Sequence, residues 1–196
     1  MMTGIQVEKL ALLVALTLGA CSSGLSAGRQ VPSLESKPTQ QLLKDLESTD
    51  QEEAHKAVIE IMRRGEVMLP ALLELKGNKR GFYGYGLGHP NAAFLTPMPS
   101  GNRKRDDERV ITVEVVALYL ASGIYYGTLE FAQGALLTDE TPTKMQRSNT
   151  RDRVAKAWSS LESWSKRWNA EGLDVLRKKN DGPLKSPGVR FWGTPD

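Results

Sequence analysis

Residues 50–75, DQEEAHKAVIEIMRRGEVMLPALLEL, contain the pattern that decides the fold class. Apolar residues recur there at steps of three and four, the period of an amphipathic helix, at Ala54, Ala57, Val58, Ile61 and Met62. Asp50 suits the N-cap, with Glu53 at capping-box spacing, and Gly65 suits the left-handed residue that ends a helix. The segment therefore predicts a helix between Asp50 and Gly65.

A further helix is predicted on each side of this one. Upstream, TQQLLKDLES (39–48) places three leucines on one face of a short helix. Downstream, Pro70 suits the first turn of a third helix, which carries four leucines. These leucines are Leu42, Leu43 and Leu46 upstream, and Leu69, Leu72, Leu73 and Leu75 downstream.

The block 39–77 resembles a HEAT-type helical repeat. The matching residues, in the helix-turn-helix order of that family, are Asp50, Ala54, Ala57, Ile61, Gly65, Leu69, Pro70, Leu72 and Leu73. His55 stands where many HEAT repeats have an arginine. Such repeats normally stack in threes or more to bury their faces, and the chain has no second clean copy. The resemblance therefore implies that later residues supply the missing packing surface.

Those later residues begin with a long irregular loop. Residues 78–104 are rich in glycine, proline and aromatics, which predicts no regular element. The run 106–126 has acidic residues in its first turn and is apolar almost all round from Val110 to Tyr126. It predicts a buried helix that stops at Gly127, although its β-branched start also fits a strand. Residues 149–179 predict a long amphipathic helix, broken near Gly172, and a turn-rich tail follows with Phe191 and Trp192 as anchors. We expect a mainly α, single compact helical domain.

The first residues have the pattern of an export signal. Residues 10–18 are apolar but too few to span a bilayer, which needs roughly 20 helical residues. The stretch Leu18-Gly19-Ala20-Cys21 resembles the lipobox of bacterial lipoproteins. That resemblance implies cleavage before Cys21 and lipid attachment to its sulfur. An ordinary secretory signal with an incidental Cys, or a buried N-terminal helix, are the alternatives.

The organisation that follows has three parts. Residues 1–20 are the expected signal peptide, 21–38 a flexible tether, and 39–196 the helical domain, composed of blocks 39–77, 78–104 and 105–196. The resemblance to lipoproteins implies a location in the cell envelope, anchored to a membrane by lipid. In Gram-negative members of that family, an Asp after the Cys tends to retain the protein in the inner membrane. Ser22 stands there instead, so the resemblance implies the periplasmic leaflet of the outer membrane if the host is Gram-negative.

Composition excludes several classes of protein. In 196 residues, 40% are hydrophobic and 25% charged, which argues against a disordered chain or a polytopic membrane protein. One Cys and two His argue against a disulfide scaffold and a Cys/His zinc site, and we expect no cofactor and no metal. All 13 aromatic residues lie at or after Phe82.

The loop 81–99 offers the first candidate binding surface, through Phe82, Tyr83, Tyr85 and His89. Its glycines match neither phosphate-binding spacing, and a helix precedes it, so a nucleotide loop is disfavoured. Aromatics folded back on the helices would make the loop structural. Tyr mixed with Gly would otherwise suit recognition of a partner or a glycan.

Three tryptophans at helical spacing offer the second candidate surface, namely Trp158, Trp164 and Trp168. This spacing is first that of a packing face, and a sugar-stacking or partner groove is the alternative. His55 and His89 lack the further ligands that a metal site needs, and His55 is expected at the surface.

Charge is distributed unevenly along the chain. Residues 21–143 hold 13 basic and 16 acidic side chains, whereas 144–196 hold 12 basic and 6 acidic. The basic third could attract anionic headgroups or an anionic envelope polymer, or could be no more than the solvated face of a helix. No nucleic-acid-binding motif is present, and we expect no nucleic-acid partner.

We therefore predict a membrane-anchored envelope lipoprotein that is not an enzyme and serves as an interaction or scaffold module with an envelope protein partner. Two alternatives remain at this stage. One is an envelope hydrolase or glycan-binding protein that uses the 81–99 loop. The other is an immunity-type lipoprotein that caps a toxin.

Overall fold

A computed structural model describes residues 37–84, 111–139, 148–185 and 188–194, all within one compact unit, Leu34–Asp196. Its helices are α1 (Thr39–Asp45), α2 (Gln51–Arg64), α3 (Leu69–Leu73), α4 (Val113–Tyr126), α5 (Arg151–Glu171) and α6 (Leu173–Lys178). Two short 3₁₀ helices, η2 (Gly65–Met68) and η4 (Leu129–Phe131), and two strands, β1 (Leu137–Asp139) and β2 (Val189–Phe191), complete the described elements. The prediction of a mainly α fold is confirmed.

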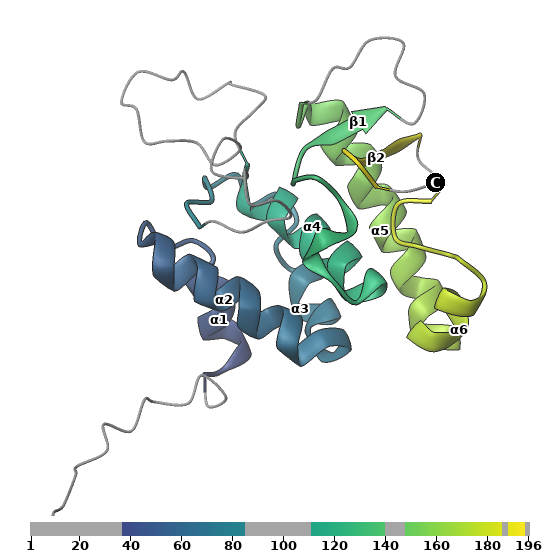
Figure 1. Ribbon diagram of the computed structural model, residues 1–196, viewed down its shortest axis with the longest axis horizontal. Helices are drawn as coiled ribbons and strands as arrows, with labels where there is room; N and C mark the ends of the chain where they lie inside the picture. Colours follow the sequence, from purple (N-terminus) through teal and green to yellow (C-terminus); the bar gives the residue numbers. More distant parts are fainter. Residues whose placement is uncertain (1–36, 85–110, 140–147, 186–187, 195–196) are drawn as a thin grey trace, which may run out of the picture. The chain divides into compact units, whose positions relative to one another are not determined.

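Helix α4 forms the centre of the domain. Every residue from Val113 to Tyr125 is buried, which explains why this segment is apolar all round. The helix contacts α2 and α3 with one side and α5 with another, so in Figure 1 it lies between the α1–α3 block and α5. It begins later than the predicted residue 106. Ile111 and Thr112 are extended instead, and Thr112 bridges to Gly81.

The α1–α3 block follows the sequence pattern closely. Asp50 accepts hydrogen bonds from the backbone N–H groups of Glu52 (2.8 Å) and Glu53 (3.1 Å), as an N-cap should. The capping box is incomplete, because the Glu53 carboxylate accepts from the Ser48 hydroxyl. Gly65 ends α2 at a φ of 63°, and Pro70 lies in the first turn of α3.

Helices α5 and α6 form the other side of the domain. The predicted long helix is broken as expected, because Gly172 has a φ of 84° and separates the two. The buried residues of α5 share one face that packs on the core, and they are Arg153, Val154, Ala157, Trp158, Leu161, Trp164 and Ser165.

A two-stranded antiparallel sheet was not predicted. Leu137 pairs with Phe191, Thr138 with Arg190 and Asp139 with Val189. Phe191 is buried, as expected of an anchor, and its ring packs edge-on against Tyr119 of α4 at 5.1 Å. The sheet therefore attaches the C-terminal tail to the central helix.

None of the helices in the described part of the chain has the length and hydropathy needed to span a membrane. The expected signal peptide, Cys21 and the tether up to residue 36 lie outside the described residues. Most of the irregular 78–104 block, from residue 85 on, also lies outside them.

Candidate functional site

The tryptophans pack the core and do not form an open groove. Trp158 and Trp164 are buried, so the suggestion that they line a binding surface is wrong. The Trp164 ring stacks on the Trp168 ring at 6.5 Å, and its Nε1 donates to the backbone carbonyl of Asp181 (2.8 Å). Trp168 is half-buried, and its Nε1 donates to the Glu66 carboxylate at 2.5 Å. The helical spacing of the tryptophans therefore corresponds to a packing face, which is its usual meaning.

The base of the 81–99 loop is anchored in the core. Phe82 is fully buried, so its assignment to a surface is also wrong, whereas Tyr83 is half-buried. The Phe82 N–H donates to the carbonyl of Ile111 at 2.9 Å, which joins the two ends of the loop. Tyr85 and His89 lie outside the described residues, and their role stays a prediction.

A buried carboxylate supports this base. Glu114, in the first turn of α4, accepts from the backbone N–H of Gly77 (3.1 Å) and from the ammonium of Lys79. Asn78 and Arg80 both donate to the half-buried carboxylate of Glu47, which follows α1. Hydrogen bonds and ion pairs thus hold residues 77–80 between Glu47 and α4. The described polar groups here serve to position the chain.

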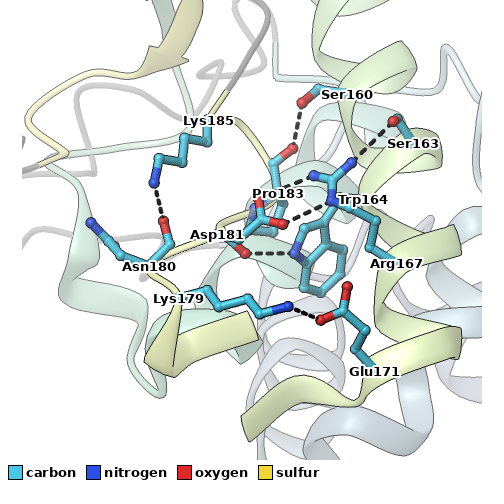
Figure 2. A network of polar contacts seen from close by, with 10 residues as sticks. All are labelled: Ser160, Ser163, Trp164, Arg167, Glu171, Lys179, Asn180, Asp181, Pro183 and Lys185. Atoms are coloured by element: carbon cyan, nitrogen blue, oxygen red, sulfur yellow. Dashed lines mark hydrogen bonds and ion pairs between the residues drawn. The ribbon is translucent and has the colours of Figure 1, made fainter. Parts of the chain in front are cut away.

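A second segment is held against α5. We call residues 179–185 the C-terminal strap (Figure 2). The Asp181 carboxylate accepts from the Arg167 guanidinium at 2.8 and 3.1 Å, and the Pro183 carbonyl accepts from Ser160 Oγ at 2.7 Å. Donation of these hydrogen bonds to the Asp181 carboxylate also raises the pKa of Arg167. Gly182 fits closely, because a Cβ there would lie 3.1 Å from the Tyr125 ring.

A third polar cluster lies where the described chain begins. We call Lys37, Asp45, Glu60, Arg63 and Arg64 the entry cluster. Lys37 Nζ lies 2.7 Å from the buried Asp45 carboxylate, and Arg64 donates to the Lys37 carbonyl at 2.7 Å. Glu60 is buried and accepts from both arginines at 2.7–2.9 Å, and these hydrogen bonds lower its pKa to about 2. The cluster fixes the point at which the preceding residues join the fold.

The outer side of α2 carries an exposed apolar residue among charges. Glu52, Lys56, Ile59 and Arg63 follow one another at steps of four and three, which places them along one side of the helix. We call them the α2 outer stripe. Ile59 is 48% exposed, and Val67 in η2 is 74% exposed, the highest value among the large hydrophobic residues described. Single exposed apolar residues are common on protein surfaces. Ile59 and Val67 are candidates for a binding surface only because of their position beside charged residues.

Ile59 was not among the predicted surface residues, although its position in the helix carried a signal. The buried set 54, 57, 58 and 61 leaves residue 59 on the opposite side of a helix with 100° per residue. An isoleucine at such a position is expected to meet solvent. The spacing therefore already identified Ile59 as an apolar side chain outside the core.

Charge also distinguishes the two sides of the domain. Residues 37–84 carry eight basic and eight acidic side chains, whereas residues 148–194 carry ten basic and five acidic ones.

No group of three or more His, Cys, Asp or Glu among the described residues is placed to hold a metal ion. His55 is half-buried rather than fully exposed.

Comparison of the chain with protein-family models, with curated proteins and with solved structures finds no match.

Proposed function

We propose that this protein is a bacterial envelope lipoprotein, acylated at Cys21, whose helical domain is a protein-interaction module. The observation that carries the proposal is the position of Cys21, the only cysteine of the chain, directly after Leu18-Gly19-Ala20 and an apolar run. Each buried acyl CH₂ contributes about 0.8 kcal/mol, and two or more chains give stable attachment. Such a protein stays on its membrane.

The division of the chain is compatible with cleavage at this point. The compact unit begins at Leu34, and the described core begins at Leu42. Removal of residues 1–20 therefore takes nothing from the described core. Residues 22–36 would then connect the lipid to the entry cluster, and their Ser, Gly and Pro content suits a tether.

The α2 outer stripe and Val67 are the surface that best suits a protein partner. Ile59 offers apolar area to bury, and the charged side chains of Glu52, Lys56 and Arg63 surround it with groups of both signs. An apolar centre with a polar rim is the usual composition of a protein interface. This arrangement supports a module that binds another protein through α2.

Metabolic labelling with a clickable palmitate tests the anchor. The wild-type chain should be labelled, and Cys21→Ser should not be. The matched control is the double variant Cys21→Ser/Ser23→Cys, which keeps one thiol but moves it two residues away from the lipobox. We expect no label on this control either. Labelling of either variant, or none on the wild type, would overturn the lipoprotein assignment.

Photo-crosslinking in intact cells tests the interaction module. A crosslinking side chain at Ile59 or Val67 should give one discrete protein adduct that Lys44, an exposed position on α1, does not give. The same adducts from all three positions would indicate random contact. That result, or no adduct from Ile59 and Val67, would remove the α2 outer stripe as the interface.

A further inference from the structure

The surplus positive charge of the domain is found on α5, α6 and the C-terminal strap. Most acidic residues there are already neutralised, since Asp181 pairs with Arg167, Glu171 with Lys179 and Glu162 with Lys76. Five exposed basic side chains make no ion pair with another described residue. They are Arg151, Lys156, Lys166, Lys178 and Lys185, and we call the face of α5 that carries Lys156 and Lys166 the basic side.

The two lysines of α5 lie opposite its buried face. With 100° per residue, Lys156 and Lys166 fall on the side of the helix away from Leu161, the middle of the buried set. They are ten residues apart, which corresponds to about 15 Å along the axis. Ser159 and Ser163 lie between them and are exposed. This side of α5 therefore presents two separated positive charges with short serine side chains between them.

Helix α6 adds an apolar residue beside a further lysine. Val175 is 40% exposed and lies three residues before Lys178, so the two are neighbours on the helix surface. Lysine ammonium groups are point charges, which suit scattered phosphates better than one bidentate ligand. Val175 could contact the acyl boundary while the lysine beside it contacts headgroups, although the charge of the lysines is the main attraction.

We propose that the basic side rests on the anionic phospholipid headgroups of the membrane to which the protein is anchored. The choice of a bilayer rests on the lipid anchor proposed above. A flexible chain of 15 residues has a root-mean-square length of about 20 Å, so a tether as long as residues 22–36 would keep the domain near the headgroups. Each basic side chain close to an anionic bilayer increases binding about fivefold. The tether holds the protein at the membrane, and the basic side gives it an orientation there.

Vesicle co-sedimentation tests binding by the basic side in a chain that lacks the lipid anchor. The chain used is residues 21–196 with Cys21→Ser, which retains the whole compact unit. It should bind vesicles containing phosphatidylglycerol, should not bind vesicles of phosphatidylcholine alone, and should dissociate in 0.5 M salt, because surface charges are screened there. Acylation of Cys21 plays no part in this assay and is measured separately by palmitate labelling.

The decisive variant is Lys156→Gln/Lys166→Gln, and the matched control is Lys44→Gln/Lys56→Gln. Both pairs remove two exposed helical lysines and the same net charge. We expect at least tenfold weaker binding for the first pair and less than twofold for the control, with unchanged circular dichroism for both. Equal losses in both variants, or no binding of the parent chain to anionic vesicles, would overturn the proposal. Binding to isolated cell-wall polymer but not to vesicles would overturn it too.

Discussion

The α1–α3 block and the α5–strap region achieve stability in different ways. In the block, the core is aliphatic and the ion pairs of Glu60 in α2 are local, because its partners Arg63 and Arg64 lie three and four residues further along the chain. In the other region, aromatic side chains join aliphatic ones in the core, and the hydrogen bonds that hold the strap join residues 14 to 23 positions apart. Contacts between residues close in the sequence therefore characterise the first region, whereas hydrogen bonds between distant segments characterise the second.

The largest effect is expected in the aromatic region. Trp164→Ala should reduce the free energy of unfolding by about 3–5 kcal/mol, because it leaves a cavity in the core. The same substitution also leaves the Asp181 carbonyl without its donor. Chemical denaturation measures the change, and faster proteolysis within the C-terminal strap should accompany it.

The control for this prediction is Trp168→Ala. Trp168 is only half-buried, so its loss should destabilise the protein clearly less. An equal loss for the two variants would mean that the stacked pair, and not the anchor to Asp181, stabilises this region.

An intermediate effect is expected in the α1–α3 block. Glu60→Gln should cost about 1–3 kcal/mol at pH 7, because two arginines lose a buried charged acceptor. The pKa of Glu60 falls from 4.5 to about 2 on folding, so its contribution is fully present above pH 4.5. That contribution is lost as the pH falls through about 2.

Denaturation between pH 2 and 7 checks this dependence. The stability difference between wild type and Glu60→Gln should shrink as the pH falls below 4.5. Glu52→Gln, which breaks an exposed pair with Lys56, should change stability by less than about 1 kcal/mol. A difference at Glu60 that does not vary with pH would show that packing, not charge, is the main contribution of this residue.

The smallest effects are expected at the helix caps, one in each region. Asp50→Ala should cost about 1 kcal/mol, and Thr150→Ala less, because Asp50 accepts two backbone N–H groups and Thr150 accepts one at 3.3 Å. Thermal denaturation measures both changes, and Asp50→Asn should restore most of the first. A larger loss at Thr150 would contradict the view that local signals matter more in the α1–α3 block.

Local signals in the sequence located the helices well. The Asp50 cap, the Gly65 and Gly127 stops and the break at Gly172 were all readable, because each depends on one residue's own conformational preference. The start of α4 was misplaced. Ile111 and Thr112 are extended because they bond to the chain at residues 80–82, a contact that no local pattern records.

The burial of the candidate binding residues likewise could not be predicted from local sequence patterns. The spacing of the tryptophans placed them on one face of α5, but it could not tell a packed face from an open groove. Burial of Trp164 depends on Tyr125 and on Asp181, which come from other parts of the chain. Phe82 similarly became a core residue because the ends of the loop are joined at Ile111.

The sequence by itself determined the mainly helical fold, the positions of most helix ends and the lipobox resemblance on which the proposed anchor rests. These follow from intrinsic preferences and from spacing within one segment. Only the tertiary structure decided the β1–β2 pairing, the attachment of the C-terminal strap and which aromatic residues are buried. These features join residues far apart in the chain, and their free energy arises only when the chain has folded around α4.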